Sequence, residues 1–254
     1  PTRRSSDLEF TKGKDILDVW FDSGVCWSAV QKKRTGMTQP ADLYLEGSDQ
    51  HRGWFHTSLL ASVAAEGIAP FKTVLTHGFV MFAKGQKMSK SLGNTVDPLD
   101  VIKNSGTDIL RLWAAHEDYS QDLSCNPENF ERLTETYRRL RNTVRFLLGN
   151  LYDYDPKDAI AYKDMTKLDQ WALTKLNNLV ALVTESYDRY EFYKIYHALN
   201  TFVTVDLSSF YLDILKDRLY VRKKDGHMRR SAQTALYEIT TTLSKLMAPI
   251  LSFL

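Results

Sequence analysis

Apolar residues occur in short runs over residues 1–120 and in long helical stripes from residue 121 onward. In the first part, residues 43–45 and 73–76 read as buried strands, and residues 54–64 carry apolar side chains at helical spacing. A strand, a helix and a second strand predict a parallel crossover unit, which is typical of an α/β doubly wound, Rossmann-like sheet. Ligands bind such sheets at the carboxyl ends of the strands, which here are residues 46–50 and 77–79.

The helix that follows residue 50 has candidate capping residues directly before it. Ser48 and Asp49 have side chains that can accept hydrogen bonds from the first free N–H groups of a helix. We therefore expect one of them to act as the N-cap.

Three apolar stripes predict amphipathic helices in the second part. The first stripe contains Leu168, Trp171, Ala172, Leu176, Leu179, Val180, Val183 and Tyr187. The second contains Phe192, Ile195, Leu199, Phe202, Val203, Phe210 and Ile214. The third contains Ala232, Ala235, Leu236, Ile239, Leu243, Leu246, Met247 and Ile250. Such helices, joined by short connections, predict an all-α bundle.

Composition and charge limit the classes of partner. Of the 254 residues, 43% are hydrophobic, which is enough for one large or two medium domains. Lys and Arg number 33 and Asp and Glu 31, so a nucleic acid would have to bind local basic patches. Cys26 and Cys125 lack metal-ligand spacing, so no protein metal site is predicted. No apolar run reaches membrane-spanning length, and we expect a cytoplasmic, monomeric protein without a membrane partner.

Residues 84–94, KGQKMSKSLGN, are the strongest candidate for chemistry. Two lysines three residues apart, with two serines and glycines in a polar loop, suit a polyphosphate, because ammonium groups can follow charge onto a leaving pyrophosphate. A run of Lys, Ser and Gly can equally be a solvated loop. A generic P-loop NTPase is excluded, because the chain contains no Gly-x-x-x-x-Gly-Lys-Ser/Thr.

Within that loop, residues 87–91 read KMSKS, the signature of class I aminoacyl-tRNA synthetases. Residues 18–24 (DVWFDSG), 46–55 (EGSDQHRGWF) and 75–79 (LTHGF) resemble segments of the isoleucyl-tRNA synthetases. Within the second segment, the residues SDQHRGWF resemble the bacterial type of these enzymes. The related enzymes for valine, leucine and methionine share KMSKS but differ in the first two of these segments. A helical tRNA-binding domain after this loop is also what the resemblance implies.

The resemblance implies roles for individual residues. Lys87 and Lys90 would be catalytic, stabilising the transition state as the isoleucine carboxylate attacks the α-phosphorus of ATP. The residues that would bind ATP and the adenylate are Glu46, Gly47, Asp49, Gln50, His77, Gly78, Met88 and Ser89. Trp20 and Trp54 would form apolar walls for a branched side chain, although both can equally be core aromatics. ATP would bind with Mg²⁺, because its phosphates need charge neutralisation.

Two basic clusters are candidates for tRNA contact. Arg138, Arg141 and Arg145 share one face of a predicted helix, at spacings of three and four. A second cluster around Gly226 contains Arg222, Lys223, Lys224, Arg229 and Arg230. Such clusters can bind RNA phosphates, but a solvated helix face remains the alternative for each.

The domain prediction is that residues 9–120 form the late half of the catalytic domain and residues 121–254 a helical anticodon-binding domain. Residues 1–8, PTRRSSDL, resemble the translation of a sequencing adapter. The His-x-Gly-His element of class I synthetases and the insertion that hydrolyses misactivated valine do not occur in the chain. We therefore expect an isoleucine–tRNA ligase segment that is inactive alone, with isoleucine, ATP and tRNA(Ile) as partners of the whole enzyme. A non-catalytic tRNA-binding module and a valine-type synthetase are the alternatives.

Overall fold

The computed structural model describes residues 11–82 and 85–254. The chain divides into two compact units, Pro1–Phe79 and Val80–Leu254. The predicted adapter scar at residues 1–8 lies outside the described residues. The predicted domain boundary between residues 120 and 121 stays a prediction.

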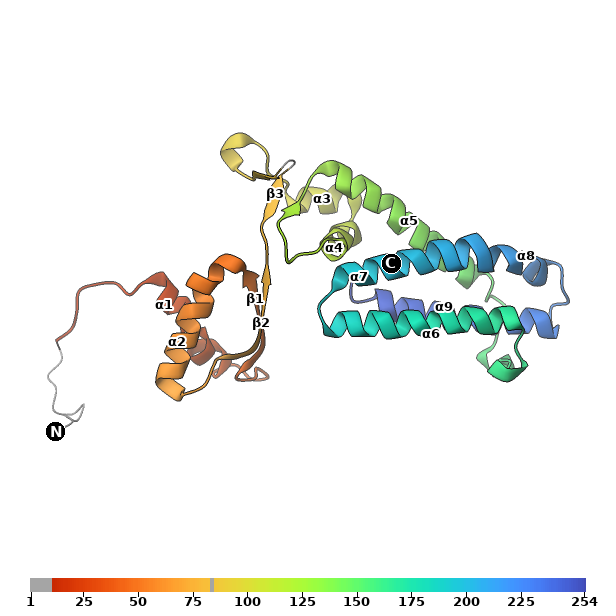
Figure 1. The fold of residues 1–254 in the computed structure, drawn as a ribbon, viewed down its shortest axis with the longest axis horizontal. Helices are drawn as coiled ribbons and strands as arrows, with labels where there is room; N and C mark the ends of the chain where they lie inside the picture. The colour runs from red at the N-terminus through yellow and green to blue at the C-terminus, as the bar shows by residue number, and fades with distance from the viewer. Residues whose placement is uncertain (1–10, 83–84) are drawn as a thin grey trace. The chain divides into compact units, whose positions relative to one another are not determined.

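The first unit contains a parallel pair of strands and the helix that connects them (Figure 1). Strand β1 (Ala41–Gly47) pairs with β2 (Phe71–His77) in a register that places Ala41 beside Phe71 and Gly47 beside His77. Helix α2 (Trp54–Glu66) makes the crossover and ends at Gly67, whose φ of 74° is the left-handed conformation that glycine adopts without strain. The predicted strand–helix–strand unit is therefore confirmed.

Short helices complete the first unit. Helix α1 (Val19–Gly24) begins at Asp18, whose carboxylate accepts a hydrogen bond from the Trp20 N–H at 2.8 Å. It is followed by a π-helical turn, η2 (Trp27–Gln31), and by the 3₁₀ turn η3 (Ser48–Arg52) between β1 and α2.

The second unit begins with a three-stranded sheet in the order β4-β3-β5. Strand β3 (Val80–Phe82) is antiparallel to β4 (Gln86–Lys87) and parallel to β5 (Leu123–Ser124). The 3₁₀ turn η5 (Lys90–Leu92) follows β4.

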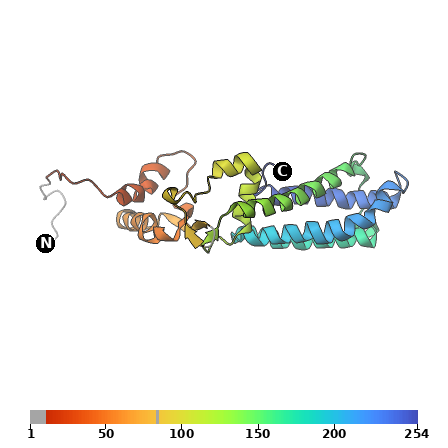
Figure 2. The ribbon, with the colours of Figure 1, turned by 90° about the horizontal axis from the view of Figure 1, so that it is seen from above.

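A helical bundle forms the rest of the second unit (Figures 1 and 2). Its α-helices are α3 (Pro98–Ser105), α4 (Thr107–His116), α5 (Pro127–Gly149), α6 (Lys167–Asp188), α7 (Phe192–Thr201), α8 (Leu212–Tyr220) and α9 (His227–Met247). Asp97 and Asn126 cap α3 and α5, each with a proline in the first turn, where a missing N–H costs nothing. Two 3₁₀ turns, η6 (Pro156–Asp158) and η7 (Tyr162–Asp164), lie in the connection between α5 and α6.

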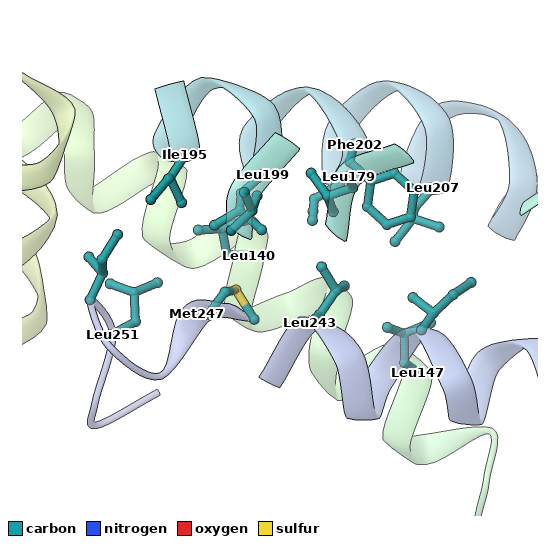
Figure 3. Close-up of a cluster of buried hydrophobic side chains, with 14 of the residues drawn as sticks. Leu140, Leu147, Leu179, Ile195, Leu199, Phe202, Leu207, Leu243, Met247 and Leu251 are labelled. Carbon is teal, nitrogen blue, oxygen red and sulfur yellow. The ribbon is translucent and has the colours of Figure 1, made fainter. Parts of the chain in front are cut away.

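The core of the bundle draws on α5, α6, α7 and α9 (Figure 3). Leu147 of α5, Val183 of α6, Ile195 of α7 and Leu243 of α9 are all 0% exposed. The first and third predicted stripes are confirmed as faces that pack on this core.

The second stripe is correct only as far as Val203. Phe210 and Ile214, which the helical spacing places in the core, are 45% and 43% exposed. The chain continues from α7 through a π-helical segment, η8 (Phe202–Tyr211), in which each turn holds more residues than an α-helical turn. The wider turns shift the phase of the stripe, so that Leu207, Tyr211 and Leu215 are buried instead.

Candidate functional site

The carboxyl ends of β1 and β2 bring three of the predicted ligand-binding residues together. Gly47 and His77 lie side by side in the strand register. A Cβ on Gly47 would lie 2.6 Å from the Asp49 Oδ1 atom and 3.6 Å from the His77 Cε1 atom. A larger residue at position 47 would therefore displace the Asp49 carboxylate from its place over the strand end.

The side chain of Gln50 connects this carboxylate to the helix that follows. Its Nε2 donates to Asp49 Oδ2 at 3.2 Å, and its Oε1 accepts from the Trp54 N–H at 3.0 Å. The expectation that Ser48 or Asp49 is the N-cap is wrong, because neither side chain makes a capping hydrogen bond. Gln50 supplies the acceptor instead, because the 3₁₀ turn before α2 places its side-chain oxygen within hydrogen-bonding distance of the Trp54 N–H, the first of the helix.

Trp54 is fixed on one face and along one edge. Its ring stacks on Tyr44 with centroids 4.1 Å apart and planes 9° apart, and its Nε1 donates to the Ser23 carbonyl at 3.1 Å. Tyr44 is 2% exposed and bonds Ser58, and burial raises its pKa to about 12. The indole is half-buried, so it is a rigid apolar surface rather than a mobile one.

Trp20 lies against the backbone of Gly53. A Cβ on Gly53 would be 2.8 Å from the Gln50 Oε1 atom and 3.2 Å from two atoms of the Trp20 ring, so a larger residue would displace both side chains. Trp20 remains 42% exposed. Its role, and that of Trp54, as walls for a branched side chain stays a prediction.

Glu46 and Gly78 complete the group in the first unit. Glu46 is exposed at the end of β1, and the His77 Nδ1 atom lies 2.8 Å from the Gly78 carbonyl oxygen. The carboxylates of Glu46 and Asp49 can accept hydrogen bonds from an ammonium or from ribose hydroxyls.

The signature loop in the second unit is held by one amide side chain. Asn94 Oδ1 accepts from the Ser89 N–H at 2.8 Å, and Asn94 Nδ2 donates to the Lys87 carbonyl at 3.2 Å. Ser89 Oγ and Ser91 Oγ are 2.7 Å apart. Asn94 lies at the end of the motif, and the spacing alone does not show that its side chain folds back on the loop.

The two signature residues that precede Ser89 are placed differently. Lys87 is exposed at the end of β4, whereas Met88 is partly buried and packs against the core of the bundle. Met88 thereby anchors the loop, and its role in binding ATP and the adenylate stays a prediction. The side chain of Lys90 lies outside the described part of the structure.

Arg138, Arg141 and Arg145 lie on α5 with exposed side chains. Arg138 pairs with Glu135 at 2.7 Å in an exposed pair, which contributes little to stability and leaves the guanidinium accessible. Their binding to tRNA stays a prediction.

The second basic cluster contains two kinds of residue. Arg222 and Lys223 are exposed and form exposed pairs with Asp217 and Asp225. Arg229 is only 5% exposed and forms a buried ion pair with Asp153. Its assignment to an RNA-facing cluster is therefore wrong, because the guanidinium is buried. The sequence does not reveal this, since the partner Asp153 lies 76 residues earlier in the chain.

Among the residues that the structure describes, no group of three or more His, Cys, Asp or Glu side chains is arranged to hold a metal ion. No helix in the same part of the chain is both long and apolar enough to cross a membrane.

Comparison with known proteins identifies the family. The family described as tRNA synthetases class I (I, L, M and V) matches residues 3–126, and the anticodon-binding domain of tRNA ligase matches residues 169–254. The isoleucine–tRNA ligase of Petrotoga mobilis is 56% identical over 247 residues, which cover 96% of this chain and 27% of that protein. The isoleucine–tRNA ligase of Syntrophotalea carbinolica is 57% identical over 246 residues, which cover 96% of this chain and 26% of that protein.

Solved structures share the fold at lower identity. The ternary complex of Agrobacterium radiobacter K84 agnB2 LeuRS with tRNA and LeuAMS matches with a TM-score of 0.72 at 18% identity, covering 92% of this chain and 30% of that one. Mycobacterium tuberculosis methionyl-tRNA synthetase in complex with methionyl-adenylate matches with a TM-score of 0.69 at 21% identity, covering 84% and 42%. The chain spans about a quarter of the length of the curated relatives. By its sequence, this chain belongs to the class I tRNA synthetases and is similar to isoleucine–tRNA ligases over nearly all of its length.

Proposed function

We propose that this chain is the part of an isoleucine–tRNA ligase that binds isoleucyl-adenylate, holds the phosphates of ATP and binds tRNA(Ile). The observation that carries the proposal is the identity of 56–57% over 96% of the chain to isoleucine–tRNA ligases. The intact KMSKS loop, braced by Asn94, supports a catalytic rather than a decayed segment.

In the proposed reaction the isoleucine carboxylate oxygen attacks the α-phosphorus of ATP. A carboxylate–phosphorus bond forms, the bond from the α-phosphorus to the bridging oxygen breaks, and pyrophosphate leaves with its electron pair. No general base is needed, because the carboxylate is ionised at neutral pH. Transfer to tRNA then moves the isoleucyl group to a ribose hydroxyl and releases AMP.

Each group of side chains has a proposed task in that reaction. Glu46 and Asp49 bind the isoleucine ammonium and the ribose hydroxyls, with Gln50 holding the Asp49 carboxylate in place. Lys87 and Lys90 neutralise charge that develops on the phosphates, and Mg²⁺ accompanies ATP as part of the substrate. Positioning and electrostatics supply the catalysis.

The tRNA-binding part of the proposal rests on the helical unit. Arg138, Arg141 and Arg145 of α5, together with Arg222 and Lys223, are exposed cations that can bind phosphates. The match of residues 169–254 to an anticodon-binding domain supports the assignment of Arg222 and Lys223, which lie within the matched residues.

A chimera tests the activity. This chain would replace the aligned residues of the Petrotoga mobilis enzyme, and ATP–pyrophosphate exchange would be measured with isoleucine and with valine. Folding of the chimera would be verified by circular dichroism. Exchange that depends on isoleucine and exceeds that with valine supports the proposal. A folded chimera that prefers valine would favour a valine-type enzyme, and one without exchange would favour a non-catalytic tRNA-binding module.

A further inference from the structure

Tyr44 is a buried residue that lies flat against one of the two tryptophans. It belongs to β1, three residues before Gly47, and is only 2% exposed. Its ring is stacked on the Trp54 indole, with the ring centroids 4.1 Å apart and the planes 9° apart. One face of the indole is therefore covered by the phenol ring, and only the opposite face is left for a substrate.

The Tyr44 ring is itself held by α2, the helix that begins at Trp54. The Tyr44 hydroxyl lies 3.1 Å from the Ser58 Oγ atom, and Ser58 is 0% exposed. Ser58 follows Trp54 by four residues, so both side chains lie on the same face of α2. Phe55 and Phe71 pack around the Tyr44 ring, with centroids 6.3 and 4.8 Å away. Tyr44 is thus fixed at its hydroxyl and around its ring, and it can hold the plane of the indole.

The same indole is joined to the helix that carries the other tryptophan. Trp54 Nε1 donates to the Ser23 carbonyl at 3.1 Å, and Ser23 lies on α1 together with Trp20. Next to this bond the two helices approach closely, because a Cβ on Gly24 would lie 2.8 Å from Thr57 Oγ1. A change in the plane of Trp54 would therefore alter its spacing from Trp20.

Selection of isoleucine over valine depends on small differences in packing. The two side chains differ by one methylene, which is worth about 10–200-fold discrimination in a hydrophobic pocket. Contacts between carbon atoms weaken steeply with distance, so a gap of about 0.5–1 Å loses roughly a quarter to a half of the attraction. An apolar wall that is free to tilt therefore loses much of its ability to distinguish the two amino acids.

We infer that Tyr44 is a positioning residue for amino-acid selection, which holds the Trp54 indole in the plane needed to distinguish isoleucine from valine. Tyr44 acts through the Trp54 ring and does not contact the substrate. The inference rests on the proposed function and deepens it, because it assigns part of the selection of isoleucine to a buried residue outside the segments that resemble class I synthetases.

ATP–pyrophosphate exchange by the chimera, measured without tRNA, tests the inference. The quantity compared is kcat/KM with isoleucine divided by kcat/KM with valine. Tyr44→Leu should lower this ratio about tenfold, mainly by raising KM for isoleucine, because the contact of one methylene is lost. Tyr44→Phe should keep the ratio within about twofold of the unaltered chimera, since the ring face that stacks on Trp54 remains.

A double-mutant cycle separates action through Trp54 from a general loss of stability. In a Trp54→Leu background, Tyr44→Leu should change the ratio no further, because the ring that Tyr44 positions is gone. Phe71→Leu is the matched control. It removes an aromatic contact to Tyr44 from β2 but leaves the stacking on Trp54, so the ratio should stay unchanged.

Circular dichroism would verify the folding of each variant. If Tyr44→Leu prevents folding, Tyr44→Met takes its place, because methionine fills the space without a flat ring and should give the same decrease. The inference is overturned if the folded variant keeps the ratio of the unaltered chimera. It is also overturned if Tyr44→Leu lowers the ratio as much in the Trp54→Leu background as with Trp54 present. Failure of the proposed function would be seen separately, because the unaltered chimera would then show no isoleucine-dependent exchange.

Discussion

Arg229 and Asp153 form a bidentate ion pair in which both side chains are buried, at 5% and 7% exposure. The pair joins the segment after α5 to the start of α9. Arg229 also holds the end of α8 through the Leu219 carbonyl and the following loop through the Lys224 carbonyl. Arg229, which the sequence places in a basic cluster, therefore stabilises the packing of the bundle.

Asp153→Ala should destabilise the helical unit by about 3 kcal/mol, because it leaves the Arg229 guanidinium buried without its counter-charge. Urea unfolding followed by circular dichroism would measure the loss. Asp188→Ala, at an exposed position, should change the free energy of unfolding by less than about 0.5 kcal/mol. Equal effects of the two substitutions would contradict the stabilising role of the Arg229–Asp153 ion pair.

The same pair predicts how stability depends on pH. Hydrogen bonds from Arg229 lower the pKa of the Asp153 carboxyl from 3.8 to about 2. A carboxyl whose pKa is lower in the folded state stabilises the fold above its unfolded pKa, and that contribution, about 2 kcal/mol, is lost as the pH falls from about 4 to about 2. The free energy of unfolding should decrease over this range, and Asp153→Asn should flatten the decrease. A curve of unchanged slope in the variant would refute the linkage.

Gly24→Ala should destabilise the first unit. The added Cβ would lie 2.8 Å from Thr57 Oγ1 and 3.0 Å from its backbone carbonyl carbon, so α1 and α2 would have to separate. Overpacking of this kind costs about 1–3 kcal/mol. Unfolding followed by tryptophan fluorescence would detect the loss, since Trp54 bonds the Ser23 carbonyl next to this contact. Gly13→Ala, where no atom lies within 4 Å, serves as the control and should be neutral.

Asn94→Ala in the chimera should lower the rate of isoleucine-dependent pyrophosphate exchange by about tenfold or more, because small displacements of catalytic groups are costly. The amide bridges the Lys87 carbonyl and the Ser89 N–H, and without it the loop loses both contacts. Leu92→Ala, at a side chain that is 72% exposed in the same loop, should retain activity. If the Asn94→Ala variant kept the full exchange rate, the two hydrogen bonds of Asn94 would not be needed to position the lysines.

The patterns that were predicted correctly are those set by local periodicity. Short apolar runs and helical spacing located β1, α2, β2 and the apolar faces of α6 and α9. In α6 and α9 the reason is that burial of one face dominates the choice of residues. In α2 the spacing located the helix, although Leu60 and Val63 are 57% and 47% exposed. The segments that resemble class I synthetases could also be identified from the sequence, since each is continuous in it.

The features that were missed depend on residues distant in the sequence or on a change of helical pitch. Arg229 looks like its neighbours in the sequence, and only the fold brings Asp153 to it. The π-helical segment Phe202–Tyr211 shifts the buried face from Phe210 to Tyr211, whose hydroxyl donates to the buried Asp169 at 2.8 Å. A periodicity fixed at the α-helical value cannot show such a shift. Gln50 was missed as a cap because it lies in the 3₁₀ turn before α2, four residues ahead of the Trp54 N–H that it binds.

Charging of tRNA(Ile) with labelled isoleucine by the chimera tests the central claim most directly, because it requires adenylate formation, the signature loop and the tRNA-binding helices of this chain together. We expect the chimera to form isoleucyl-tRNA, and Lys87→Ala to reduce the rate by about a hundredfold or more, as expected when a group that stabilises transition-state charge is removed. A folded chimera that charges no isoleucine, or one whose rate is unchanged by Lys87→Ala, would contradict the account.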